Sequence, residues 1–367
     1  MDNNWSNREL IKVLKSKIRE SLKDYLADAS HDDISLAGKV WGGKGTARTF
    51  RFVMKYRDEQ EHILFAKLSP IFPKLNPGLA EYEALKILYP YFLSLSHNYG
   101  VPKPIAFYPE LNVLLMESVG SMSVKKYLTF YNKKNISFDA INKVKEVICN
   151  CGQWLRLFHS VTERGVKEQY HHKHYFDGFK NEYEVLKKLK MLSGKNIIKI
   201  ESLNKTLCTL DNNIDMPCAM WHCDFTPGHI FIQENGVKVI DIIGVYDVPI
   251  YEDIGKWLAT SATFNTFPVS WSFDYQRMLA MDSVFMNSYC ESNILVNDTF
   301  ILLSNLYRLK QLVLNLHSQY YKIIGIVPKM IANAISYQKL KPLFESNINH
   351  ALDSILNEYK RLVGNSV

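Results

Sequence analysis

The sequence predicts an α+β fold with two lobes, a small β-rich N-lobe followed by a larger helical C-lobe. Three β-like segments between residues 34 and 67 predict the first lobe. Long stretches of helical periodicity, at 138–161 and 300–321, predict the second lobe. The two textures change at Gly120-Ser121, which lets the chain turn and places the boundary near residue 118.

The composition is that of a folded protein, and 367 residues can bury a large core in two lobes. We expect a helical extension at 1–30, the β-rich N-lobe at 31–118 and the helical C-lobe at 119–367. The net charge of +7 is compatible with an anionic ligand such as a nucleotide. The basic residues are interleaved with acids, so the charge does not indicate nucleic-acid binding.

The cysteines and the N-terminus indicate the compartment. None of the six cysteines forms a CxxC pair, and the charged N-terminus lacks the apolar core of a signal peptide. No apolar run reaches the roughly 20 residues of a membrane span. The sequence therefore predicts a cytoplasmic protein with free thiols and no transmembrane segment.

The first lobe is expected to begin with an amphipathic helix at 5–27, with Ser6 as its N-cap and Glu9 three residues later. Its mixed charges favour packing on the lobe over binding to a membrane surface. The remaining elements of the lobe are strands at 35–41, 49–56, 62–67, 101–107 and 111–117, with a helix at 77–92.

A glycine-rich stretch lies between the first two strands and contains Gly42, Gly43, Gly45 and Thr46. Glycines let the backbone approach phosphates closely, and exposed N–H groups can bind anions. A plain hairpin turn is the alternative interpretation of the same residues. The third strand, which ends in Lys67, follows at the distance expected in a nucleotide-binding lobe. This distance favours phosphate binding by the glycine-rich stretch over a plain hairpin turn.

A lysine buried at the end of an apolar strand needs an anionic partner. Glu81, on the helix at 77–92, is the partner we expect for Lys67, and Glu83 is the alternative. A third interpretation leaves both glutamates in solvent.

The run from Trp221 to Gly244 organises the second lobe. His222, Cys223 and Asp224 form a polar turn, and Asn235-Gly236 predicts a hairpin between strands at 230–233 and 237–240. Asp241 ends the return strand, so the hairpin places two carboxylates at one end of a rigid element. Phosphoryl transfer needs one carboxylate to accept the hydroxyl proton and another to hold Mg²⁺ on the nucleotide.

These motifs resemble those of the aminoglycoside phosphotransferase and choline-kinase-like family, which has a protein-kinase-like fold. The family has His-Gly-Asp where this chain has His222-Cys223-Asp224, and an Ile-Asp strand end where it has Ile240-Asp241. The strand ending in Lys67 is similar to the one that delivers a lysine to the phosphates. Glu81 stands at the spacing of the family's E-x-x-x-L-x-x-L helix. The resemblance further implies that adenine binds backbone groups at a hinge formed by Met116, Glu117 and Ser118.

The resemblance implies a small-molecule kinase that transfers the γ-phosphoryl group of ATP or GTP to a hydroxyl of an aminoglycoside, sugar, choline or similar acceptor. We predict Asp224 and His222 as the catalytic residues, with Asp224 as the base and His222 supporting the turn. Asp241 would bind Mg²⁺. The residues at 42–46, with Lys67 and Glu81, would hold the phosphates. The lobe at 31–118 would thus bind the nucleotide, and the lobe at 119–367 would hold the catalytic loop and the acceptor site.

His229 departs from the family pattern, which has an asparagine there whose oxygen binds Mg²⁺. An imidazole nitrogen suits Mg²⁺ poorly. Three outcomes stay open for a metal site of Asp241 and His229: catalysis with one metal ion, use of Mn²⁺, or a degenerate, pseudokinase-like protein that binds a nucleotide or acts as a scaffold. A protein kinase is disfavoured because the chain has no Asp-Phe-Gly motif.

Three further features are interpreted as structural. His159, in the helix predicted at 138–161, is expected to lie in the core and donate to a backbone carbonyl. In the insertion at 163–217 we expect a helix at 177–192, and a solvated loop rather than a metal site at 171–174. Asp253, near the start of a helix at 251–258, is expected to accept backbone N–H groups and steady the catalytic turn.

Overall fold

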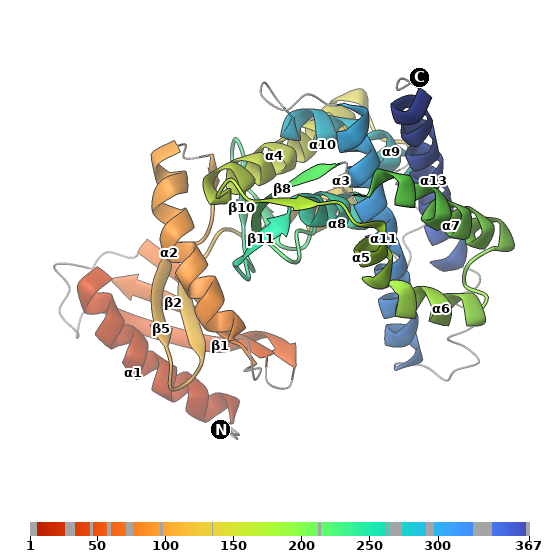
Figure 1. Ribbon diagram of the computed structural model, residues 1–367. Coiled ribbons are helices and arrows are strands. Elements are labelled where there is room, and N and C mark those ends of the chain that lie inside the picture. The colour runs from red at the N-terminus through yellow and green to blue at the C-terminus, as the bar shows by residue number, and fades with distance from the viewer. Residues whose placement is uncertain are drawn as a thin grey trace. The chain divides into compact units, whose positions relative to one another are not determined.

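The computed structural model describes residues 6–25, 34–44, 47–56, 60–70, 76–95, 98–133, 135–211, 214–261, 263, 274–290, 297–325 and 340–364. Contacts divide the chain into two compact units. The first unit comprises Met1–Ser121 and Gln233–Val245, and the second comprises Met122–Ile232 and Tyr246–Val367. The first is built on a β-sheet and the second is mainly helical (Figure 1), so the predicted α+β class is confirmed.

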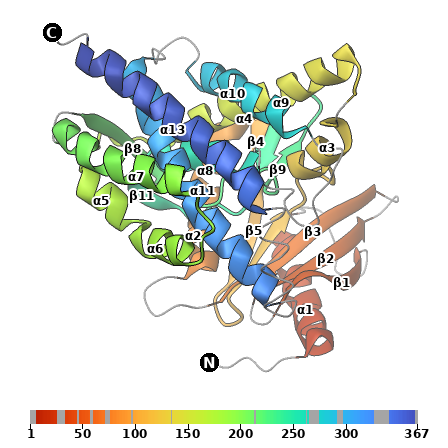
Figure 2. The ribbon, with the colours of Figure 1, turned by 90° about the vertical axis from the view of Figure 1, so that its right-hand side faces the viewer.

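The first unit contains a five-stranded antiparallel sheet in the order β1-β2-β3-β6-β5. Figure 2 shows β1, β2 and β3 side by side in this sheet. Its strands are β1 (Ile34–Lys44), β2 (Ala47–Tyr56), β3 (Gln60–Leu68), β5 (Pro104–Tyr108) and β6 (Val113–Glu117). The five predicted strands are all present, with ends that differ by a few residues. The register places Lys67 of β3 between Thr49 and Leu114, near the ends of the neighbouring strands.

Helix α1 (Asn7–Tyr25) packs on this sheet, as predicted. The expected capping box closes its first turn, because Ser6 N donates to Glu9 Oε2 at 2.9 Å and Glu9 N donates to Ser6 Oγ at 3.3 Å. The apolar side of the helix is fully buried and joins the strand side chains in one hydrophobic core through Leu10, Leu14, Ile18 and Leu22.

Helix α2 (Pro77–Leu95) also belongs to the first unit and places two glutamates on different faces. Glu81 shares the buried face with Leu85 and Leu88, at the spacing of successive helical turns. Glu83 is exposed and forms an ion pair with Lys86 at 3.4 Å. The helix therefore presents Glu81, and not Glu83, to the interior of the unit.

Strand β10 (Val237–Val239) joins the first unit by pairing in parallel with β4 (Tyr99–Gly100). The predicted Asn235-Gly236 turn precedes it and is closed by a hydrogen bond from Gln233 N to Gly236 O at 2.9 Å. A Cβ atom at Gly236 would lie only 2.1 Å from Asn98 O, so this position has no room for a side chain. The close approach fixes the start of β10, and with it the position of Asp241.

The second unit consists of helices and short strands. Its helices are α3 (Val124–Tyr131), α4 (Phe138–Thr162), α5 (His172–Asp177), α6 (Lys180–Lys188), α7 (Gly194–Leu207), α8 (Tyr251–Ser261), α9 (Tyr275–Ala280), α10 (Asp282–Tyr289), α11 (Asp298–Ile324) and α13 (Lys341–Gly364), with a 3-10 turn η2 (Cys208–Leu210). Its strands are β7 (Lys167–Gln169), β8 (Asp215–Trp221), β9 (Ile230–Ile232) and β11 (Val245–Pro249), whose first residue belongs to the first unit. Helix α11 packs against both α8 and α13, and α4 packs against α10.

The insertion at 163–217 is more regular than the sequence predicted. The helix expected at 177–192 is the shorter α6, and the rest of the insertion contains β7, α5, α7, η2 and the first three residues of β8. The solvated loop predicted at 171–174 is wrong, because α5 begins at His172. Asp211 accepts a hydrogen bond from His172 N at 2.6 Å and also binds the ring, so a residue 39 positions away supplies the partner for the first turn.

Gly255 lies where α8 packs on α11, and its substitution is expected to destabilise the protein. A Cβ atom there would lie 2.5 Å from the carbonyl carbon of Tyr307 and 2.7 Å from Arg308 N. Because both atoms are backbone, relief requires α8 or α11 to shift. We expect Gly255→Ala to lower the free energy of unfolding by about 3 kcal/mol, measured by urea denaturation. Gly194→Ala is the control, since a Cβ at Gly194 meets nothing within 4 Å; equal unfolding midpoints for the two variants would contradict the expectation.

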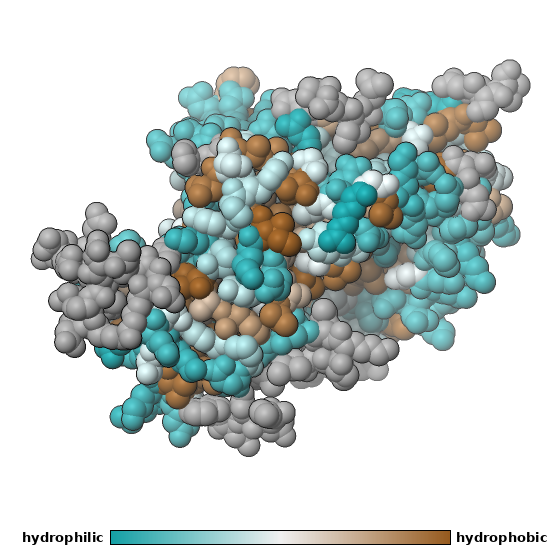
Figure 3. Space-filling view, turned by 60° about the vertical axis from the view of Figure 1, so that its left-hand side comes forward, coloured by the Kyte–Doolittle hydropathy of each residue, from teal (hydrophilic) through white to brown (hydrophobic). Residues whose placement is uncertain are grey.

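The surface in Figure 3 shows hydrophobic residues in several separate groups among hydrophilic ones. Large exposed hydrophobic side chains include Trp41, Ile87 and Phe138, on different elements of the chain. Within the described ranges, no helix has both the length and the apolar character needed to cross a membrane.

Candidate active site

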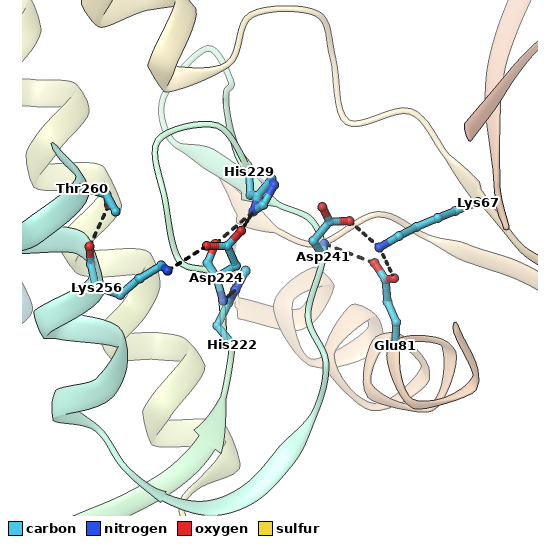
Figure 4. Close-up of polar contacts among 8 residues, drawn as sticks. All are labelled: Lys67, Glu81, His222, Asp224, His229, Asp241, Lys256 and Thr260. Carbon is cyan, nitrogen blue, oxygen red and sulfur yellow. Dashed lines mark hydrogen bonds and ion pairs between the residues drawn. The ribbon is translucent and has the colours of Figure 1, made fainter. Parts of the chain in front are cut away.

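The predicted site residues divide between the two units. Lys67, Glu81 and Asp241 belong to the first unit, whereas His222, Asp224 and His229 belong to the second. The residues of each group are joined by polar contacts within their own unit (Figure 4).

In the first unit, Glu81 connects Lys67 to the end of strand β10. Lys67 Nζ donates to Glu81 Oε2 at 2.6 Å and to Asp241 Oδ1 at 2.5 Å. Asp241 N donates to the other oxygen of Glu81, Oε1, at 3.1 Å. The ion pair that the sequence predicted between Lys67 and Glu81 is therefore present. Glu81 also holds Asp241, a contact that the sequence did not predict.

Burial and charge distinguish the three members of this cluster. Burial alone would lower the pKa of Lys67, but the charges of Glu81 and Asp241 outweigh it and raise the pKa, so the ammonium stays charged. Burial raises the pKa of Glu81, and Asp241 adds to the rise while Lys67 opposes it. The Glu81 side chain is 3% exposed, against 26% for Lys67 and 29% for Asp241. Glu81 thus binds its two partners from inside the unit, whereas the side chains of Lys67 and Asp241 reach the surface of the unit.

In the second unit, Asp224 lies on the turn between β8 and β9, with its side chain 46% exposed. Its carboxylate is flanked by two basic side chains: Lys256 Nζ is 3.4 Å from Oδ1, and His229 Nδ1 is 3.3 Å from Oδ2. His229 Nδ1 also lies 2.9 Å from the backbone oxygen of Asp224. Because a carbonyl oxygen only accepts, Nδ1 carries the hydrogen and donates it.

The sequence did not single out Lys256. The signal was present, because Lys256 follows Asp253 by three residues on α8, and residues at this spacing share a helix face. Asp253 was already expected to face the catalytic turn, so its neighbour on that face was a candidate as well.

His222 is fully buried and lies beside the rings of Trp154, Phe158 and Phe225, with centroid distances of 6.2, 6.3 and 5.6 Å. Asp224 N donates to its Nδ1 at 3.3 Å, so the ring supports the backbone of the turn. His222 N donates to Asp253 Oδ2 at 2.9 Å, which confirms the predicted contact between Asp253 and the turn.

His159 lies in the core, as predicted, but its predicted carbonyl partner is wrong. Its Nδ1 bonds with Tyr289 Oη at 2.8 Å, and its Nε2 lies 3.3 Å from Asp253 Oδ2. Both partners come from elements far away in the sequence, so the helix that carries His159 gave no sign of them. His159 therefore supports Asp253 behind the turn that carries Asp224.

Comparison with solved structures identifies the fold. A choline/ethanolamine kinase family protein from Mesorhizobium loti matches with a TM-score of 0.52 and 14% identity over 93% of this chain and 98% of that chain. A glucosamine kinase matches with a TM-score of 0.55 and 12% identity over 90% of this chain and 85% of that chain. A choline kinase from Cryptosporidium parvum Iowa II matches with a TM-score of 0.50 and 12% identity over 97% of this chain and 97% of that chain. The chain has the protein-kinase-like fold of these kinases. No protein-family model and no curated protein matches the sequence.

The kinase-like fold confirms the predicted fold. The structure describes part of the glycine-rich stretch at 42–46, which the sequence predicted to hold phosphates. Gly42 and Gly43 lie at the end of β1, and a Cβ at Gly42 would meet nothing within 4 Å, so packing does not require glycine there. Gly45 and Thr46 lie outside the described residues. Close approach of a phosphate to this stretch stays an expectation.

The hinge expected in the kinase-like fold has two donors already in use. Glu117 N donates to Lys103 O at 3.0 Å, and Ser118 N donates to Ile63 O at 2.9 Å. Met116 is buried in β6. A nucleotide base that binds here would therefore need other backbone groups than these two N–H groups.

Cys223 occupies the position at which the family that the sequence resembles has glycine, and its backbone explains why glycine suits it. Its φ of 77° lies in the left-handed region, which strains most side chains. Burial raises the pKa of its thiol to about 11, with Asp253 and Asp224 adding to the effect, so the thiol stays protonated at neutral pH.

Cys223→Gly is expected to be about 1 kcal/mol more stable than Cys223→Ala, because glycine relieves the left-handed strain and alanine keeps it. Chemical denaturation of both variants measures the difference. A glycine variant that is less stable than the alanine variant would show that the strain is absent.

Proposed function

We propose that the protein is a small-molecule kinase that transfers the γ-phosphoryl group of ATP or GTP to a hydroxyl of a small acceptor. One observation carries the proposal: a chain with a kinase-like fold has both the Lys67–Glu81–Asp241 cluster and an accessible Asp224. The turn that holds Asp224 is fixed by hydrogen bonds to the His222 ring and to Asp253. As further support, a glucosamine kinase with a TM-score of 0.53 was solved in complex with glucosamine, ADP and inorganic phosphate.

The first unit would bind the nucleotide phosphates. Lys67 is held charged by two carboxylates and reaches the surface, so its ammonium would contact the phosphate oxygens. Glu81 would keep that ammonium in place from inside the unit. Gly42, Gly43, Gly45 and Thr46 would cover the phosphates through backbone N–H groups.

The second unit would supply the base. Asp224 is accessible, and its backbone is fixed by His222 and His229. Its carboxylate would accept the proton of the acceptor hydroxyl, a contribution of typically ~10² to 10⁴ in rate. Lys256 and His229 lie on either side of the carboxylate and would hold its orientation.

A divalent cation would neutralise charge on the phosphates when bound. Asp241 fits this role, since its carboxylate offers hard oxygen ligands and its side chain reaches the surface. His229 fits poorly. Its Nδ1–H is donated to Asp224, which leaves only Nε2 to offer a lone pair, and Mg²⁺ prefers oxygen. In the described part of the chain, no three His, Cys, Asp or Glu side chains are grouped to hold a metal ion.

Nucleotide binding and turnover test this function. The protein is incubated with ATP or GTP, Mg²⁺ or Mn²⁺, and a panel of alcohol acceptors, and ADP or GDP release is followed. We expect transfer that is lost in Asp224→Ala and Asp241→Ala. Nucleotide binding without turnover on any acceptor would favour the second candidate, a degenerate kinase-like binding protein, which His229 in place of asparagine motivates. Absence of nucleotide binding would exclude both.

His229→Ala separates a role in positioning Asp224 from a role as metal ligand. We expect kcat to fall on the order of tenfold, because Asp224 loses the Nδ1–H donor, while the Mg²⁺ concentration for half-maximal activity stays unchanged. Titration of Mg²⁺ at saturating ATP gives both values. A large rise in the Mg²⁺ requirement with kcat restored at high Mg²⁺ would show that His229 is a ligand.

A further inference from the structure

A cavity of about 500 Å³ lies beside Asp224, with every lining residue in the second unit. Its walls come from the catalytic turn and from helices α3, α8, α11 and α13. Three of its lining residues are lysines, Lys125, Lys256 and Lys322. Asp224 is the one acid among the described lining residues. Among the described lining residues, basic side chains therefore outnumber acidic ones.

The three lysines reach the cavity from three different helices. Lys256 points from α8 to the Asp224 carboxylate (Figure 4), and its side chain is 19% exposed. Lys125 is in the first turn of α3, which is tied to the catalytic turn by a hydrogen bond from Lys125 N to Pro227 O at 2.7 Å. Lys322 is in the last turn of α11. In the described chain, neither Lys125 nor Lys322 has a carboxylate within ion-pair distance, so their charges are not neutralised there.

This lining is unsuited to a cationic acceptor. Recognition of an ammonium group relies on carboxylates or on accessible aromatic faces. The single carboxylate, Asp224, is already flanked by Lys256 and His229, and the one aromatic residue among the described lining residues, Phe344, is fully buried. The other lining groups are mostly hydroxyls and amides, such as those of Thr226, Ser318 and Gln319, which suit the hydroxyls of a sugar.

We propose that the acceptor is a hydroxylated anion, a sugar acid or a sugar phosphate, whose anionic group binds Lys125 and Lys322 while one hydroxyl faces Asp224. The proposal rests on the kinase function proposed above. It assigns the anion to the two lysines that have no carboxylate partner in the described chain, and leaves Lys256 to the carboxylate of the proposed base. The transfer itself is unchanged: the γ-phosphoryl group passes to the acceptor oxygen, ADP leaves, and the hydroxyl proton passes to Asp224.

A panel of glucose and three of its derivatives that carry different charges tests the proposal. Glucose, glucosamine, glucuronate and glucose 6-phosphate are compared in the presence of ADP by calorimetric binding, and in the presence of ATP and Mg²⁺ by turnover. We expect the two anions to bind at least tenfold more tightly than glucose, and glucosamine to bind more weakly than glucose. Raised salt should weaken only the binding of the anions.

Charge reversal of the lysines is the second arm of the test. Lys125→Glu and Lys322→Glu are each expected to weaken anion binding on the order of tenfold, with KM for ATP unchanged. Lys126→Glu is the matched control, because Lys126 is also an exposed lysine on α3 and is not among the described residues that line the cavity.

The outcomes separate the two proposals. A rise in KM for ATP in the lysine variants would overturn the acceptor proposal by assigning the lysines to the nucleotide. Equal or tighter binding of glucosamine, or binding of no panel member by a protein that binds ADP, would also overturn it and leave the kinase function standing. Failure to bind ADP, or ATP turnover that persists in Asp224→Ala, would count against the kinase function itself.

Discussion

Asp224→Asn is expected to lower kcat for phosphoryl transfer by about 10² to 10⁴-fold, with nucleotide affinity within about twofold of the wild type. Asparagine has the shape of aspartate and leaves the backbone bonds to His222 and His229 in place. Its amide cannot take up the proton of the acceptor hydroxyl. Coupled detection of ADP gives kcat, and calorimetric titration gives the nucleotide dissociation constant.

The control for this variant is Asp139→Asn, an exposed aspartate in the first turn of α4. It removes one negative charge from the second unit without touching the catalytic turn, and should retain full activity. If Asp224→Asn kept kcat within about threefold of the wild type, Asp224 would not be the base. An equal loss in both variants would point to an effect of net charge.

The fold was predictable where the pattern is local. The strands of the first unit, the capping box at Ser6 and Glu9, and the long helices α4 and α11 all follow from periodicity and caps within a few residues. The insertion was harder to predict. Helix α5 starts where Asp211 accepts a hydrogen bond from His172 N. A local sequence pattern cannot predict a contact between residues 39 positions apart.

The site shows the same division between local and tertiary signals. Lys67, Glu81, Asp224 and Asp241 stood out because each ends a strand or lies at a recognisable spacing. What those spacings could not show is how the groups share partners. Glu81 binds Asp241 N as well as Lys67, and His229 donates to the residue that it follows by five positions. Both contacts need the chain to fold back, so they appear only in three dimensions.

Glu81→Ala is expected to impair the nucleotide site that we propose for the first unit. The variant removes the partner of Lys67 at 2.6 Å and the acceptor for Asp241 N at 3.1 Å in one step. We expect nucleotide affinity to fall on the order of 100-fold and the free energy of unfolding to fall by about 3 kcal/mol, since a buried charge pair is broken. Titration of ADP and urea denaturation measure the two effects.

Two variants sharpen this test. Glu83→Ala removes the exposed glutamate of the same helix, which pairs with Lys86 at the surface, and should leave nucleotide affinity unchanged. Glu81→Gln keeps an oxygen that can accept the hydrogen bond from Asp241 N but removes the negative charge. Its losses of nucleotide affinity and of stability should therefore lie between those of Glu83→Ala and Glu81→Ala. Equal effects of Glu81→Ala and Glu83→Ala would remove Glu81 from the site.

The pH dependence of Glu81→Gln adds a test of charge alone. The two carboxylates raise the pKa of Lys67, so the stability that this lysine contributes is fully present below its unfolded pKa of about 10.4 and is lost only as pH rises through the higher folded value. Removal of the Glu81 charge lowers the folded pKa. The alkaline limb of nucleotide binding should therefore move to lower pH in Glu81→Gln and stay in place in Glu83→Ala. An unmoved limb in Glu81→Gln would mean that Asp241 alone keeps Lys67 charged.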